Sequence, residues 1–176
     1  MEVSQLQSLP EAMNSLTDLQ EMEIDDMPNL QSFVIDDLPI SLRELTVGSV
    51  GGIMWNTEPT WEHLTCLSVL RINGNATVNT LMPLLPASLV TLCISGLNNT
   101  SIDGMWLQHL TSLQNLEIVN PPKLKSLPKK GFPSSLSVLN MTRCPLLKAI
   151  LRRKRGKEWS KIAHIPAIII DDELIT

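Results

Sequence analysis

Leucine residues recur along this chain in a spacing that no single helix or strand can use. Within residues 110–128, Leu110, Leu113, Leu116 and Ile118 are separated by three, three and two positions. The change from a spacing of three to a spacing of two indicates a turn that runs into a short extended segment. A strand of so few residues needs neighbours of the same kind. The pattern therefore predicts that similar strands pair with it on both sides.

Six copies of this pattern cover most of the chain. Their reference leucines, each placed just before an expected strand, follow one another at intervals of 22 to 25 residues: Leu19, Leu42, Leu67, Leu89, Leu113 and Leu136. A period of about 20 to 29 residues is typical of leucine-rich repeats. We therefore expect an α/β leucine-rich repeat solenoid. A curved parallel sheet would form its concave side, irregular or short helical segments its convex side, and a cap its C-terminal end.

The copies alternate between two sequences in front of the strand. Those at Leu19, Leu67 and Leu113 begin with L-T-x-L, whereas the three others begin with P-x-S-L. The array is therefore expected to be built from a double unit of about 47 residues.

Three parts of the chain are expected. Residues 1–15 contain LQSLP, which matches LKSLP at 124–128 in the convex half of a later repeat. We interpret residues 1–15 as the convex half of a truncated upstream repeat, with a degenerate N-terminal cap as the alternative. Residues 16–150 hold the six repeats, and residues 151–176 form a C-terminal capping segment.

The capping segment departs from the repeat pattern. Trp159, Ile162 and Ala163 have the spacing of a helical stripe, and a proline and an extended Ala-Ile-Ile-Ile segment follow. We expect a short helix that covers the end of the stack. His164, beside the stripe, is interpreted as a packing histidine.

Other conspicuous side chains have a packing interpretation. Trp61 and Trp106 occur at the same repeat position, at the ends of the two longer returns that begin at residues 48 and 95. Two copies of one specific ligand site would be unusual, so we expect both to pack on the convex side. Cys144 precedes a proline at an inward position and is expected to be buried, whereas Cys93 lies between two inward residues and is expected to face solvent.

Composition limits the class of protein. The chain is 43% hydrophobic but only 3% aromatic and contains no tyrosine, which fits thin layers filled by leucine. The sequence shows no apolar run of membrane-spanning length and no secretory signal. Cys66, Cys93 and Cys144 form no C-x-x-C and cannot all pair with one another, which favours a reducing, intracellular setting.

Charge is distributed unevenly along the chain. Residues 1–62 hold twelve acidic residues and one basic residue, whereas residues 121–170 hold twelve basic residues and one acidic residue. A basic cluster is the candidate electrostatic docking patch: Lys148, Arg152, Arg153, Lys154, Arg155 and Lys157. Binding of nucleic acid, binding of an acidic protein and nuclear import remain open. Without interleaved aromatic residues, a solvated or intramolecular role is favoured and nucleic acid is not expected.

These sequences resemble one known family. The L-x-x-L-x-x-L-x-I pattern, C-P-x-L at 144–147 and W-x-K-I-A-H-I-P at 159–166 are similar to the C-terminal leucine-rich repeats of plant intracellular immune receptors of the coiled-coil, nucleotide-binding type. The likeness covers essentially all 176 residues. It implies a cytoplasmic disease-resistance protein whose repeats recognise a pathogen effector or a guarded host protein and restrain a switch domain. The phosphate-binding sequence G-x-x-x-x-G-K-[ST] is absent from these residues, so they do not contain that switch.

The expected concave face is the candidate protein-binding site. Its side chains alternate with packed leucines and are free to vary, and such a face usually binds protein. The candidate residues are Glu21, Glu23, Asp25, Glu44, Thr46, Val69, Arg71, Asn73, Thr91, Cys93, Asn115, Glu117, Val138 and Asn140. We expect no catalytic residue, metal site, cofactor or small-molecule substrate, because no nucleophile set, metal-ligand spacing or phosphate loop is found.

Four other interpretations stay open. The chain could be a gene fragment without function, or a stand-alone repeat adaptor without a switch domain. An enzyme is the weakest alternative, because the adjacent aspartate pairs would diverge. An extracellular receptor is suggested by N-x-[ST] sequences at Asn75, Asn98, Asn99 and Asn140, but a glycan on Asn140 would lie on the concave face.

Overall fold

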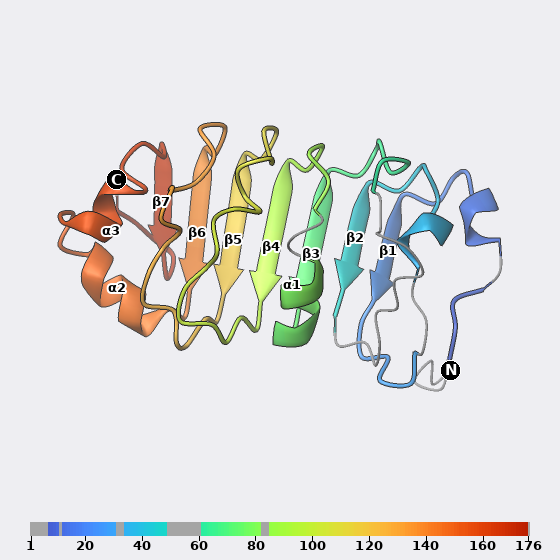
Figure 1. The fold of residues 1–176 in the computed structure, drawn as a ribbon, viewed down its shortest axis with the longest axis horizontal. Coiled ribbons are helices and arrows are strands. Elements are labelled where there is room, and N and C mark those ends of the chain that lie inside the picture. Colours follow the sequence, from blue (N-terminus) through green and yellow to red (C-terminus); the bar gives the residue numbers. More distant parts are fainter. Residues whose placement is uncertain (1–6, 11, 31–33, 49–60, 82–84, 176) are drawn as a thin grey trace.

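The expected strands lie side by side in the order of the sequence (Figure 1). The computed structural model describes residues 7–10, 12–30, 34–48, 61–81 and 85–175. The six strands predicted from the repeats are β1 (Glu21–Ile24), β2 (Glu44–Val47), β3 (Val69–Asn73), β4 (Thr91–Ser95), β5 (Asn115–Val119) and β6 (Val138–Thr142). Each pairs in parallel with the next. The chain is therefore a solenoid with a single, mainly parallel sheet.

Two further strands extend the sheet at its C-terminal end. β7 (Ala167–Ile170) pairs in parallel with β6, and β8 (Glu173–Leu174) pairs antiparallel with β7. The extended segment expected after the proline is confirmed as β7. Its place in the parallel ladder and the eighth strand after it were not predicted from the sequence.

Few helices occur among the described residues. They are the 3₁₀ turns η2 (Met13–Ser15) and η3 (Ile35–Asp37), and the helices α1 (Asn75–Leu81), α2 (Pro145–Leu151) and α3 (Lys157–Ser160). Neither α1 nor α2 was predicted. α2 begins at Pro145, which suits a first helical turn because that position needs no backbone N–H. The two ends of the described chain lie at opposite ends of the row of strands (Figure 1).

The core lies under one face of the sheet. In β3, Leu70 and Ile72 are fully buried while the residues between them are half-buried, and β4, β5 and β6 repeat this alternation. Burying one leucine or isoleucine side chain is worth about 1.5–3 kcal/mol, so columns of such residues account for a stable stack without aromatic packing.

A single turn geometry explains the spacing of three in front of each strand. The backbone N–H of Leu113 donates to the carbonyl of Leu110 at 3.2 Å, and the other five reference leucines make the same bond to the residue three positions earlier. Ile165 makes it to Ile162 at 2.9 Å, just before β7. The turn begins with leucine or proline and ends with leucine in all six repeats, and the closing leucine is fully buried in most of them.

The alternation between L-T-x-L and P-x-S-L corresponds to a hydrogen bond between neighbouring repeats. The hydroxyl of Ser41 donates to the carbonyl of Leu19 at 2.7 Å, and that of Ser88 donates to the carbonyl of Leu67 at 2.9 Å. A longer contact of 3.5 Å joins Ser135 to the carbonyl of Leu110. Each serine-containing repeat thus bonds to the threonine-containing repeat before it, which supports the double unit.

The packing predictions are mostly confirmed. Trp61 and Cys144 are buried, and Trp106 is partly buried against the core. The long return that begins at residue 48 lies outside the described part over residues 49–60. No described helix is long and apolar enough to cross a membrane.

The helical stripe in the capping segment is only partly correct. Ile162 is fully buried and Trp159 is half-buried against the core, but Ala163 and His164 are exposed. The interpretation of His164 as a packing residue is wrong. α3 ends at Ser160, and the chain then turns toward β7, which leaves residues 163 and 164 on the outside of that turn.

Candidate protein-binding face

Three columns of side chains run across the strands on the side opposite the core, which we call the strand face. The middle column is Glu23, Thr46, Arg71, Cys93, Glu117 and Asn140. The first flanking column is Glu21, Glu44, Val69, Thr91, Asn115 and Val138. The other flanking column contains Asn73, Ser95, Val119 and Thr142, with Asp25 and Gly48 following the ends of β1 and β2. The predicted register of these residues is confirmed.

The first strands of this face carry negative charge around one arginine. Glu21 and Glu23 are exposed on β1, and Arg71 Nη1 donates to Glu44 Oε2 at 2.7 Å. This hydrogen bond is the main cause that raises the pKa of Arg71. The side chains surround an open hollow of about 550 Å³ that is lined by Glu21, Met22, Glu23, Glu44, Thr46, Arg71 and Asn73.

Asp25 reaches across β2 because Gly48 has no side chain. A Cβ atom at Gly48 would lie only 1.6 Å from Asp25 Oδ1, so the carboxylate occupies the space a side chain would fill. Asn73 Nδ2 donates to Asp25 Oδ2 at 3.3 Å, and Ser95 Oγ donates to Asn73 Oδ1 at 2.6 Å. This chain of bonds links the ends of β1, β3 and β4 and fixes the rim of the hollow.

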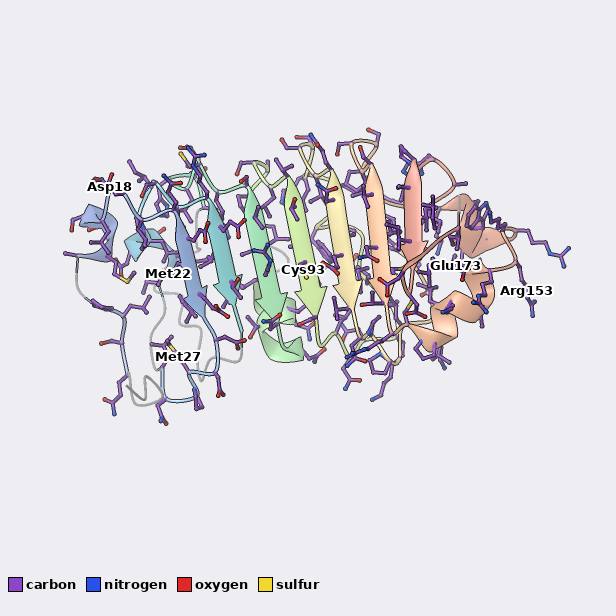
Figure 2. The ribbon with its side chains drawn as sticks, turned by 180° about the vertical axis from the view of Figure 1, so that it is seen from behind. Asp18, Met22, Met27, Cys93, Arg153 and Glu173 are labelled. Atoms are coloured by element: carbon purple, nitrogen blue, oxygen red, sulfur yellow. The ribbon has the colours of Figure 1, made fainter. Side chains whose placement is uncertain are left out.

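Cys93 lies in the middle of the strand face (Figure 2). Its side chain points away from the core, as predicted, but it is half-buried and not fully exposed to solvent. Burial, and then the charge of Glu117, raise the pKa of the Cys93 thiol to about 11. The thiol is therefore protonated near neutral pH and is a poor nucleophile. Glu117 also accepts a hydrogen bond of 3.3 Å from Asn140 Nδ2.

The strand face becomes apolar toward its C-terminal end. Ala167 pairs with Val138, and Ile169 pairs with Asn140, so β7 adds two apolar residues to two of the columns. The sequence analysis did not include either residue. The signal was present, because Ile162, Ile165 and Ile168 continue the spacing of three with isoleucine in place of leucine.

The candidate electrostatic docking patch divides into paired and exposed cations. Lys148 pairs with Asp171, and Arg152 Nη2 lies 3.2 Å from Glu173 Oε2. Lys148 and the backbone N–H of Arg143 hold the pKa of Asp171 below its usual value. The four other cations are exposed: Arg153, Lys154, Arg155 and Lys157. Two of the six cations are thus paired with carboxylates of the C-terminal segment, and the four others have no carboxylate partner among the described residues.

An ion pair fastens α3 to an earlier return. Glu158 Oε2 accepts a hydrogen bond of 2.7 Å from the backbone N–H of Leu127, and Lys161 Nζ donates to the carbonyl of Leu127 at 2.8 Å. The two side chains also bond to each other at 2.8 Å and are only 15% and 10% exposed. Both backbone polar groups of Leu127 are therefore bonded to the C-terminal segment.

The described residues contain no group of three or more His, Cys, Asp and Glu side chains that could hold a metal ion. His109 Nε2 lies 2.6 Å from the carbonyl of Leu85, a contact between returns. No family model, curated protein or solved structure gave a significant match to this chain.

Proposed function

We propose that this chain is a leucine-rich repeat module that binds another protein through its strand face. Following the sequence resemblance, its role would be that of the recognition part of a plant intracellular immune receptor. In that role it senses a pathogen effector or a guarded host protein and restrains a nucleotide-binding switch domain that lies outside these residues.

The observation that carries this proposal is the register of the strand face. Seven parallel strands at about 4.8 Å spacing give a surface roughly 29 Å wide. Its central side chains are already half-buried and held by contacts such as those of Arg71 with Glu44 and of Asn140 with Glu117. Side chains ordered before binding lose less entropy when a partner covers them, so such a surface is suited to recognition.

The chemistry of the strand face suggests which chemical groups of a partner it would recognise. Carboxylates dominate β1 and β2, polar groups the middle, and Val138, Ala167 and Ile169 the C-terminal end. A partner that places cationic groups over the first strands and apolar groups over the last ones would match this gradient. Charge would then direct its orientation, and burial of apolar area would supply affinity.

The C-terminal segment is proposed to cap the repeats. Two contacts support this role: the Glu158–Lys161 pair on Leu127, and the antiparallel pairing of β8 with β7. An antiparallel strand of two residues shortens the edge that a longer parallel strand would expose.

The test compares two charge insertions on opposite sides of the sheet. Val69→Arg/Thr91→Arg places two cations on the strand face, whereas Thr100→Arg/Thr111→Arg places them at exposed return positions. Tagged chains are expressed in plant cells, and captured proteins are quantified by mass spectrometry. We expect a partner that wild type and the return variant retain and that the face variant loses at least tenfold.

Circular dichroism of both variants controls for folding. A partner set that both variants retain equally, or lose equally while folded, contradicts binding through the strand face.

A further inference from the structure

Exposed apolar side chains collect at the two ends of the solenoid. Five of the six large hydrophobic residues that are more than a third exposed among the described residues lie there: Leu16, Ile40, Leu146, Ile150 and Leu174. The charge asymmetry of the sequence coincides with these ends. Figure 2 shows Asp18 at one end of the row of strands and Arg153 at the other.

The N-terminal end carries an acidic end patch, formed by Leu16, Asp18, Glu21, Asp36 and Ile40. Leu16 is 48% exposed and Ile40 is 58% exposed. The hydroxyl of Ser41, next to Ile40, donates to the carbonyl of Leu16 at 3.2 Å, so the two apolar residues belong to neighbouring turns. Its three carboxylates are exposed and form no ion pair with any described residue.

The C-terminal end carries a basic end patch, formed by Leu146, Ile150, Arg153 and Arg155. Leu146 and Ile150 are four residues apart on α2 and therefore lie on one side of the helix. Ile150, Arg153 and Arg155 line an open hollow of about 480 Å³. Within the described part of the chain neither arginine has a carboxylate partner, in contrast to Lys148 and Arg152.

We propose that copies of this chain associate head to tail, with the acidic end patch of one copy bound to the basic end patch of the next. Each patch has a pair of apolar residues beside charges of one sign, and the signs are opposite. Two patches of this kind can bind each other, because contact buries their apolar residues and the opposite charges orient the two copies. The two patches lie at opposite ends of one elongated body, so a single copy cannot join its own patches.

An open chain follows from this geometry. A contact between two different surfaces leaves one free patch at each end of the assembly, and further copies add there unless the rotation closes a ring. Assembly should therefore grow with protein concentration. It should also weaken with salt, because the screening length falls from about 10 Å at 0.1 M to about 3 Å at 1 M ionic strength.

Sedimentation velocity of the purified, nuclease-treated chain tests the proposal. The monomer has a mass of 19.6 kDa. In a buffer of low ionic strength we expect a weight-average mass above this value that rises over a tenfold concentration range. In 0.5 M salt we expect the monomer mass alone.

Two end variants and a matched control locate the contact. Asp18→Lys/Asp36→Lys reverses the acidic end patch without changing the strand face, and Arg153→Glu/Arg155→Glu reverses the basic one. Each variant alone should be monomeric at low salt, and an equal mixture should assemble again, because one variant then carries positive charge at both ends and the other negative charge at both ends. Lys123→Glu/Lys125→Glu changes the net charge as the basic-end variant does, at exposed positions that belong to neither patch, and should assemble like wild type.

Four results would overturn the proposal. They are a monomeric wild type at low salt, assembly that survives both end reversals, loss of assembly in the control variant, and assembly that occurs only in a parallel sample without nuclease treatment. The last result would assign the basic end patch to nucleic acid. None of these results depends on a partner of the strand face, so the proposed function is tested separately.

Discussion

The residues that follow β3 to β6 show how one backbone conformation selects a side chain. Gly74 and Gly96 have φ values of 91° and 73°, and Asn120 has 53°, all in the left-handed region. Glycine and asparagine tolerate this region, whereas other L-residues pay about 1–2 kcal/mol there. Arg143 occupies the same position after β6 with φ 54°. The long arginine side chain lacks the short amide by which asparagine can bond to the nearby backbone in this conformation.

Replacing Arg143 by asparagine should therefore stabilise the protein. We expect Arg143→Asn to raise the free energy of unfolding by about 0.5–1 kcal/mol, since the backbone N–H that bonds to Asp171 is unchanged. Chemical denaturation measures the change. Arg153→Asn, at an exposed position outside the left-handed region, is the matched control and should have no effect; an equal gain in both variants would contradict the explanation.

The Cys93 thiol gives a prediction about pH. Its pKa is raised from 9.0 to about 11, so alkylation of Cys93 should stay slow at pH 8 and accelerate only as pH approaches 11. The unfolded chain releases this proton near pH 9, whereas the folded chain holds it until about pH 11. The free energy of unfolding should therefore fall between pH 9 and 11. Mass spectrometry of the peptides measures the fraction of Cys93 that is alkylated at each pH.

Glu117→Gln removes the neighbouring charge and should shift the Cys93 alkylation profile toward lower pH, because the charge of Glu117 is the second cause of the raised pKa. An unchanged profile would mean that burial alone sets this pKa.

At the scale of elements, leucine spacing predicted strands well where the residues were leucine. It located β1 to β6 and their register, because the turn and the inward positions admit only large apolar residues. The same turn precedes β7, but isoleucine at 162, 165 and 168 and the longer distance from the sixth copy concealed it. α1 and α2 were missed because returns are constrained by packing against neighbours, which a single sequence does not display.

Alternation in β7 can be tested by truncating two adjacent isoleucines. Ile168 is fully buried, whereas Ile169 is half-buried on the strand face. Ile168→Ala should lower the free energy of unfolding by about 2–4 kcal/mol, and Ile169→Ala by less than about 1 kcal/mol. Urea unfolding of both variants provides the comparison. Equal losses would contradict the register in which β7 pairs with β6.

The Glu158–Lys161 pair gives a second test at this scale. Glu158→Gln leaves the Lys161 ammonium, which is 10% exposed, without a charged partner. We expect a loss of roughly 2–3 kcal/mol in unfolding free energy, the range for hydrogen bonds to charged groups. Glu173→Gln breaks the exposed pair with Arg152 and should cost less than about 1 kcal/mol. Similar losses in both variants would argue against a clamp on Leu127.

At the scale of the whole molecule, the sequence predicted a stack and its charge asymmetry but not the places where charges meet. The contacts of Lys148 with Asp171 and of Glu158 with Leu127 join residues 23 and 31 positions apart, and nothing in the local sequence marks them. The candidate face was predictable because a period of two fixes which side chains point outward. The hydrogen bond from Asn73 to Asp25 was not predictable, since Asp25 occupies space that any side chain at residue 48 would fill.

The account depends on the strands lying side by side in order, and one distance tests this most directly. Glu23 on β1 and Asn140 on β6 belong to the middle column, five strand spacings apart. Spin labels at Glu23→Cys and Asn140→Cys are introduced with Cys66→Ser and Cys93→Ser, leaving Cys144 buried. Electron–electron double resonance should give a narrow distribution near about 24 Å, and moving the first label to Thr46 should shorten it by about 5 Å. A broad distribution, or a distance that does not shorten with that move, would contradict the stacked order.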